Sequence, residues 1–155
     1  MKPVFHSTVL YVSNIDASRN FYEKVIGLIA IQDFGKSVSY LSGISLYEIQ
    51  ANHKLSSRIS NNKDNNAFEL YFECENIEEV YNVHRNNNTR FLHPIEEESW
   101  GQKTFRIYDP DDNIIAFGES LDISVKRMHS EGYNIDQICD KTSIEKAAIE
   151  SILDS

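Results

Sequence analysis

An internal repeat is the feature that most constrains how this chain can fold. Two stretches that begin at His6 and Phe68 read HSTVLYVSNIDASRNFYEKVIGL and FELYFECENIEEVYNVHRNNN. Each opens with β-forming residues, reaches an Asn-Ile pair at Asn14 or Asn76, and continues with apolar residues at helical spacing. A short polar side chain at this point can accept hydrogen bonds from the first turn of a helix, so both asparagines are predicted N-caps. The chain therefore repeats a strand–helix unit after 62 residues.

Three β-like segments follow each predicted helix. In the first half they are residues 28–34, 38–41 and 46–50, and in the second half residues 89–92, 104–108 and 114–118. The polar, Asn- and Ser-rich residues 51–66 indicate a linker between the halves. We therefore predict an α+β fold of two paired β-α-β-β-β modules. The sheet faces that the helices leave free would line a shared concave groove, a favoured kind of site for small molecules.

Composition and charge argue against several classes of protein. The chain has 15 Lys and Arg residues against 24 Asp and Glu residues, a net charge of −9, whereas nucleic-acid binding needs clustered cations. No apolar run approaches the roughly 18 residues of a membrane span, and the N-terminus has no signal-like segment. The only cysteines, Cys74 and Cys139, are too few for a disulfide framework. We expect a cytoplasmic protein with a small-molecule ligand and no nucleic-acid or membrane partner, and we expect a homodimer that covers exposed sheet edges.

Two blocks of sequence carry a resemblance to a known superfamily. Residues 14–28 read NIDASRNFYEKVIGL, and residues 100–113 read WGQKTFRIYDPDDN, which ends in a predicted tight turn. With the repeated modules, these blocks resemble the vicinal oxygen chelate superfamily, which includes glyoxalase I, bleomycin-resistance proteins, fosfomycin-modifying enzymes and extradiol dioxygenases. The resemblance covers roughly residues 4–119. It implies a domain over residues 1–119, with modules at about 1–52 and 66–119, followed by a helical extension over residues 120–155.

The resemblance also implies where a metal ion would bind. Metal-dependent members take ligands from four strand positions that face the groove, and these positions here hold Ser7, Glu48, Glu69 and Ala116. His6 is one residue from Ser7, and the alternation of side chains along a strand turns it away from the groove. This set offers a transition metal no imidazole. We therefore expect a degenerate metal site and no cofactor, with a weakly held divalent ion at Glu48 and Glu69 as the alternative.

Strand alternation predicts a groove with aromatic and acidic walls. Such surfaces suit a flat or partly cationic organic molecule. Core packing of Trp100 and simple surface positions for the tyrosines are the competing interpretations. The predicted ligand-binding residues are Ser7, Val9, Tyr11, Glu48, Glu69, Tyr71, Trp100, Phe105 and Ala116.

Two functions stay open for this groove. If Glu48 and Glu69 face one another, repulsion and burial should raise the pKa of at least one of them. That carboxylate could then act as a general base, or both could hold a metal weakly, in a glyoxalase-like or dioxygenase-like enzyme. Alternatively the pair binds a basic ligand without reaction, as bleomycin-resistance proteins do. We favour binding, and the sequence leaves catalysis undecided.

The C-terminal residues 120–155 have a helical pattern. Leu121, Val125 and Met128 share a helix face, Gly132 is a predicted helix stop, and a second helix begins near residue 135. Residues 142–145, Thr-Ser-Ile-Glu, read as the capping box of a third helix, whose apolar residues are at 148, 149 and 152. Three short helices invite a helix-turn-helix interpretation, but four basic against seven acidic residues argue against DNA. We expect the tail to pack on the body, on a dimer partner or at the groove mouth, and a regulatory role is the third function considered.

Overall fold

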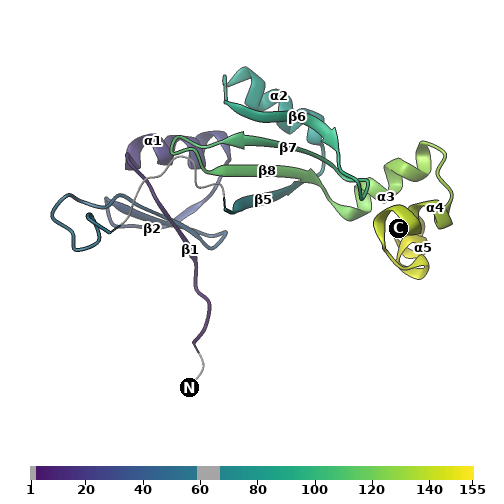
Figure 1. Ribbon diagram of the computed structural model, residues 1–155, viewed down its shortest axis with the longest axis horizontal. Coiled ribbons are helices and arrows are strands. Elements are labelled where there is room, and N and C mark those ends of the chain that lie inside the picture. Colours follow the sequence, from purple (N-terminus) through teal and green to yellow (C-terminus); the bar gives the residue numbers. More distant parts are fainter. Residues whose placement is uncertain (1–2, 59–66) are drawn as a thin grey trace. The chain divides into compact units, whose positions relative to one another are not determined.

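The computed structural model describes residues 3–58 and 67–155, so part of the predicted linker at 51–66 lies outside the described residues. Two units divide the chain: Met1–Ala67 with Asp109–Asn113, and Phe68–Tyr108 with Ile114–Ser155. Each unit contains one four-stranded sheet (Figure 1). Within the described ranges, no helix is both long and apolar enough to cross a membrane.

The first unit is a mixed sheet with a helical segment. Its strand order is β1-β4-β3-β2, in which β1 and β4 run parallel and the other neighbours run antiparallel. Asn14 accepts a hydrogen bond from the Ala17 amide at 2.9 Å, which confirms this predicted N-cap. The elements are β1 (Thr8–Tyr11), α1 (Ile15–Arg19), the π-helix η1 (Asn20–Val25), β2 (Ala30–Asp33), β3 (Ser37–Tyr40) and β4 (Ile44–Tyr47).

The core of the first unit lies between this sheet and its helical segment. Leu10 and Leu46 are partners across β1 and β4, and both are buried. The buried ring of Tyr22 in η1 lies 6.4 Å from that of Tyr40 in β3. The Tyr22 hydroxyl donates to Asp109 at 2.8 Å, so the turn at 109–113, which belongs to this unit, is tied to η1. Among the described residues of this unit, no helix lies on the opposite face of the sheet.

The second unit repeats the arrangement with order β5-β8-β7-β6 and a parallel β5–β8 pair. Asn76 accepts from the Glu79 amide at 3.1 Å, which confirms the second predicted N-cap. Helix α2 packs on one sheet face, where Tyr81 and His84 lie against the rings of Phe105 and Phe117. The elements are β5 (Glu69–Cys74), α2 (Ile77–Asn86), β6 (Phe91–Glu97), β7 (Lys103–Tyr108) and β8 (Ile114–Glu119).

The predicted elements are present, but two strands have other limits. β4 begins two residues earlier and ends three residues earlier than the predicted range 46–50, and its inward-facing residues are Ile44 and Leu46. β6 extends well past the predicted residues 89–92 and includes Pro94. β6 is an edge strand, where a residue without an amide hydrogen costs no ladder hydrogen bond on the free side.

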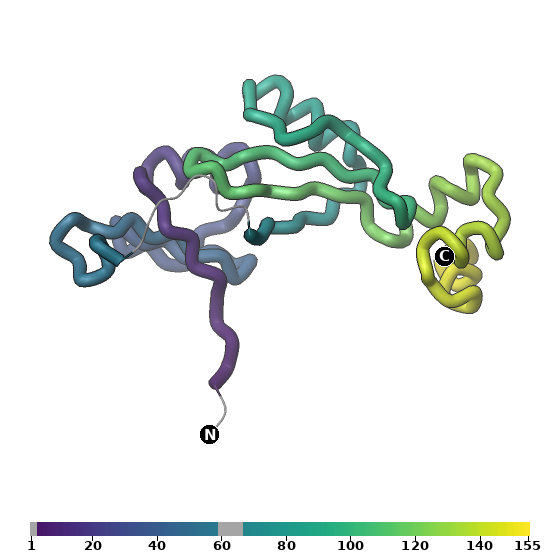
Figure 2. The backbone as a smooth tube through the Cα atoms, viewed as in Figure 1, coloured from purple at the N-terminus to yellow at the C-terminus, as the bar shows by residue number. Residues whose placement is uncertain are grey.

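The tail forms three helices with their own apolar core. α3 (Leu121–Ser130), α4 (Ile135–Thr142) and α5 (Lys146–Asp154) fold on one another, as Figure 2 shows in yellow-green and yellow. Gly132, at φ +98°, follows α3 and confirms the predicted stop. The buried residues of this core are Val125, Met128, Ile138 and Ile149.

The predicted capping box at residues 142–145 is wrong. Ser143 instead takes a left-handed conformation, with φ 60°, at the end of α4, and Glu145 makes no side-chain capping bond to α5. The capping box is at the start of α4, where Asn134 and Gln137 exchange hydrogen bonds of 2.9 Å. The alternative was visible in the sequence, since Asn and Gln at this spacing also satisfy the motif.

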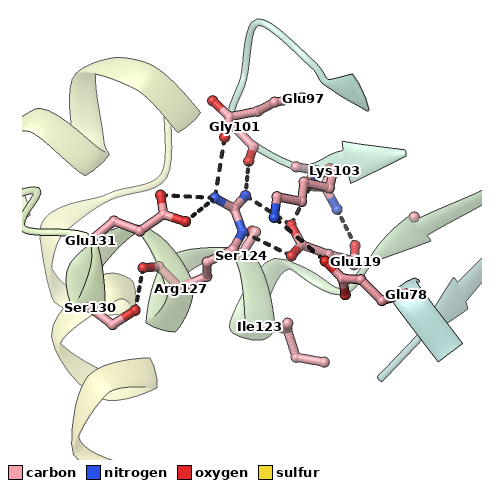
Figure 3. A network of polar contacts seen from close by, with 12 residues as sticks. Glu78, Glu97, Gly101, Lys103, Glu119, Ile123, Ser124, Arg127, Ser130 and Glu131 are labelled. Carbon is pink, nitrogen blue, oxygen red and sulfur yellow. Dashed lines mark hydrogen bonds and ion pairs between the residues drawn. The ribbon is translucent and has the colours of Figure 1, made fainter. Parts of the chain in front are cut away.

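An ion pair at the end of β8 fixes the tail to the second sheet (Figure 3). Arg127 of α3 donates to both Glu119 oxygens at 2.9 Å and to the Gly101 carbonyl at 2.6 Å. Glu119 is 3% exposed and also accepts from the Lys103 amide. Gly101 has φ +96°, and a Cβ there would lie 2.8 Å from the Met128 sulfur, so the junction requires glycine. Of the expected arrangements, the tail therefore packs on the body.

Candidate functional site

The helix-free face of the first sheet is uncharged along β1, β3 and β4. Val9 and Tyr11 point to this face and are 45% and 39% exposed. The ring centroids of Tyr11 and Tyr47, its partner on β4, lie 6.2 Å apart. Ser7 lies just before β1 and is half-buried, while His6 is exposed. We call this surface, with Ser39 and Ser45, the open face of the first sheet.

The placement of Glu48 on this open face is wrong. Tyr47 shares the open face with Tyr11, so the next residue points to the opposite side of the strand. There Glu48 accepts from Lys36 Nζ at 2.7 Å and from the Ile15 amide, at the start of α1, at 2.7 Å. The hydrogen bonds from Lys36 and from the Ile15 amide lower the pKa of Glu48, the opposite direction to that expected for a repelling carboxylate pair. Glu48 therefore stabilises the start of α1 as an ion.

The helix-free face of the second sheet is strongly polar. Strand alternation and register place on it Glu69, Tyr71 and Glu73 of β5, Thr104, Arg106 and Tyr108 of β7, and Ile114, Ala116 and Gly118 of β8. We call these residues the open face of the second sheet. Ala116 is the partner of both Tyr71 and Arg106, so this alanine lies between an aromatic ring and a cation. A Cβ on Gly118 would lie 2.1 Å from the Tyr71 hydroxyl, so glycine makes room for this side chain.

Arg106 is at the centre of the polar contacts on this face. Its Nε and Nη2 donate to the two oxygens of Glu69 at 2.7 and 3.3 Å, a two-point ion pair. Its Nη1 donates to Glu98 Oε1 at 3.0 Å. The hydrogen bond with Glu69 is the main cause of a raised pKa of the Arg106 guanidinium, so this group is permanently charged. Sequence reasoning missed Arg106, although its place between the inward-facing residues 105 and 107 assigns it to the open face.

Two further side chains, His93 and Thr104, complete the cluster around Arg106. His93 Nε2 lies 3.1 Å from Arg106 Nη1, and the Thr104 hydroxyl donates to Glu98 at 2.8 Å. Burial acts to raise the pKa of Glu98, but the hydrogen bonds from Arg106 and Thr104 outweigh it and the pKa is lowered. Ion pairs and hydrogen bonds therefore join Glu69, His93, Glu98, Thr104 and Arg106, and we call these residues the Arg106 cluster.

Two of the other predicted ligand-binding residues lie elsewhere. Phe105 is fully buried on the α2 side, with its ring 4.9 Å from that of Phe117, so its assignment to the groove is wrong. Alternation decides this point, because Phe105 and Arg106 must face opposite ways. Trp100 lies in the loop between β6 and β7, is 44% exposed, and donates a hydrogen bond from Nε1 to Gln102 at 2.8 Å. The competing interpretation that Trp100 packs in the core is therefore wrong.

Comparison with known proteins identifies the family. The sequence profile of the glyoxalase-like domain matches residues 5–122. The chain belongs to this family. Its resemblance to the glyoxalase, bleomycin-resistance and dioxygenase superfamily is thereby confirmed, and the match agrees with the predicted extent of residues 4–119. A search of curated proteins finds no match to this glyoxalase-like chain.

Solved structures share the fold of this glyoxalase-like domain. A protein of unknown function from Agrobacterium tumefaciens is 30% identical, with a TM-score of 0.66 over 78% of this chain and 97% of that one. A glyoxalase/bleomycin resistance protein/dioxygenase from Nocardioides is 14% identical, with a TM-score of 0.63 over 78% and 85%. The fosfomycin resistance protein FosX from Listeria monocytogenes is 13% identical, with a TM-score of 0.60 over 77% and 95%. At these identities the last two show the fold alone.

The residues of this glyoxalase-like domain do not fit the metal that its superfamily implies. Within residues 3–58 and 67–155, no group of three or more His, Cys, Asp or Glu side chains is arranged to hold a metal ion. Of the four predicted positions, Ala116 has no donor, Glu48 points to α1, and Glu69 is engaged by Arg106. The guanidinium thus provides positive charge beside the one carboxylate of this set that lies on an open face.

Proposed function

We propose that this glyoxalase-like domain binds a small organic molecule with a cationic group on the open face of the second sheet, without a resident metal ion. The observation that carries the proposal is Tyr71, a residue that is 44% exposed and lies between Glu69 and Glu73 on the same face of β5. An aromatic ring flanked by carboxylates attracts a cation both through the ring face and through charge.

The charge balance supports a cationic ligand over an anionic one. Arg106 is already paired with Glu69 and Glu98, and the second cation near this face, Arg90, lies 4.2 Å from the centre of the Tyr108 ring. Glu73 adds a third carboxylate, so the local formal charge is negative, and the whole chain carries −9. An anionic group would have to displace a carboxylate from Arg106, whereas a cation would not.

Bleomycin and fosfomycin are suitable probes of opposite charge, since two structural neighbours are described as resistance proteins for these compounds. Isothermal titration of the purified full chain should give binding of cationic bleomycin and none of anionic fosfomycin. Tyr71→Ala should weaken bleomycin binding by about 1 kcal/mol, roughly fivefold in Kd. The matched control is Tyr11→Ala on the first sheet, which should leave the Kd unchanged. Fosfomycin binding alone, binding of neither probe, or equal effects of the two substitutions would contradict the proposal.

A further inference from the structure

The loop at residues 98–102, between β6 and β7, carries one of the two carboxylates that pair with Arg106. Glu98, the first residue of the loop, accepts at Oε1 from Arg106 Nη1 at 3.0 Å, so its side chain lies on the open face of the second sheet. Its amide donates to the Gln102 carbonyl at 2.8 Å, and its carbonyl accepts from the Gly101 amide at 2.9 Å. The position of the Glu98 carboxylate beside Arg106 therefore depends on the position of this loop.

The tail holds the other side of this loop (Figure 3). Arg127 Nη2 donates to the Gly101 carbonyl at 2.6 Å, and a Cβ on Gly101 would lie 2.8 Å from the Met128 sulfur, so the loop and α3 are in close contact. The Gln102 side-chain amide donates to the backbone carbonyl of Glu119, the buried partner of Arg127, at 2.7 Å. Arg127 and its partner therefore fix the end of the loop that closes on its first residue by backbone hydrogen bonds.

The residue before the loop gives the tail a second hold on it. Glu97 ends β6, and its two oxygens pair with Lys141 and, at 3.2 Å, with Arg127. The next residue, Glu98, pairs with Arg106. Neighbouring residues of an extended chain point to opposite sides, so the first of these carboxylates faces the tail and the second faces the open face. A displacement of the tail would therefore act directly on the backbone that carries Glu98.

We infer that Arg127 is a positioning residue for the open face of the second sheet: by holding this loop it keeps Glu98 against Arg106. The Thr104 hydroxyl orients the Glu98 carboxylate at 2.8 Å, whereas the loop sets where the Glu98 backbone lies. With both Glu69 and Glu98 in place, all three nitrogens of the guanidinium contact a carboxylate. Without Glu98 this arginine would repel a cationic ligand more strongly. The role rests on the proposed function, because it sets the charge that such a ligand meets.

A ligand-free test uses Trp100, the only tryptophan in the chain and a residue of this loop. Its Nε1 donates to Gln102 at 2.8 Å, so acrylamide quenching of its fluorescence reports how firmly the loop is held. In the full chain, Arg127→Met should raise the quenching constant roughly 1.5-fold, because the loop opens more often. Lys126→Met is the matched control, since it removes one positive charge from α3 at a side chain that donates to Ser155 within the tail. Its quenching constant should equal that of the native chain.

A second variant covers the case in which Arg127→Met releases the whole tail. Arg127→Lys keeps a positive charge beside Glu119, but its single nitrogen does not reproduce the fork that holds Glu119 and Gly101 together. It should also raise the quenching constant of Trp100, while circular dichroism shows that the helices of the tail are retained.

The positioning role is measured at Arg106 itself. The proton–nitrogen correlation signal of the Arg106 Nε–H should shift in Arg127→Met, because Glu98 no longer engages the same guanidinium. A loss of tail attachment alone would leave this signal unchanged. Bleomycin affinity should fall about fivefold in Arg127→Met and stay native in Lys126→Met. Adding Arg127→Met to Glu98→Gln should weaken binding no further, because both substitutions act through the same carboxylate.

Three results would overturn the inference. They are an unchanged Trp100 quenching constant and Arg106 signal in both Arg127 variants, equal changes in Lys126→Met, and a further loss of affinity in the double variant. If the native chain binds no bleomycin, the proposed function fails, and the two ligand-free signals still decide whether Arg127 positions Glu98.

Discussion

The two sheets have one topology and very different open faces. Both place a parallel pair of strands beside two antiparallel ones and cover one face with a helix that an asparagine caps. On β1, β3 and β4 the open face of the first sheet carries Val9, tyrosines and serines, whereas that of the second carries the Arg106 cluster. Duplication of the β-α-β-β-β unit therefore fixes where an open face occurs and leaves its chemistry to individual residues.

The largest difference that we expect between the units concerns their ion pairs. Arg127→Met should lower the free energy of unfolding by about 3 kcal/mol, because Glu119 would be left as a buried, unpaired carboxylate. Arg19→Met in the first unit, which breaks pairs with Glu23 and Asp33 at a more exposed position, should have a far smaller effect. Urea denaturation of both variants makes the comparison. Equal losses of the free energy of unfolding in the two variants would show that the Arg127–Glu119 pair does not stabilise the attachment of the tail to the second sheet.

The pH dependence of stability should come from the second unit. Burial lowers the pKa of His84 to about 4 in the folded protein, whereas an unfolded histidine titrates near 6.5. The unfolded chain therefore binds more protons in this interval, and stability present above about pH 6.5 is lost as the pH falls toward 4. Between pH 7 and pH 5 the loss should be about 2 kcal/mol.

Urea denaturation of the native chain and of His84→Phe at both pH values tests this point. The variant should lose much less stability on acidification than the native chain. An unchanged slope in His84→Phe would place the pH sensitivity in other groups.

Gly118→Ala should disturb the open face of the second sheet with a smaller effect on stability. The new Cβ would meet the Tyr71 hydroxyl, so this side chain must move, at a cost of about 1 kcal/mol. Bleomycin binding should weaken together with the change in tyrosine position. Ser45→Ala on the first sheet is the control, since it loses only the hydrogen bond to Ser39 and should leave binding intact. Normal bleomycin affinity in Gly118→Ala would show that the placement of Tyr71 is not important.

Periodic patterns predict the fold well because they reflect which face of each element is buried. The two Asn-Ile helix starts and the tail core around Val125 follow from such patterns. Site residues are harder to predict, because a shift of one residue reverses the direction of a side chain. The sequence pattern places Glu48 on the face where Tyr47 lies and Phe105 on the face where Arg106 lies, whereas both side chains point to the opposite face.

The sequence around Arg106 does not show which side chains this arginine contacts. Its partners come from two other segments, Glu69 from β5 and His93 and Glu98 from β6 and the residue after it, and only the register of the sheet brings them together. The homodimer, the cytoplasmic location and the domain limits at 52, 66 and 119 stay predictions.

The most direct test of the difference between the two open faces is amide chemical-shift mapping of the full native chain during titration with bleomycin. The account predicts that the shift changes concentrate at Glu69–Glu73, around Arg106 and around Ala116, while Val9, Tyr11 and Tyr47 change little. Changes concentrated at Val9, Tyr11 and Tyr47, or no changes at all, would contradict the assignment of ligand binding to the second sheet.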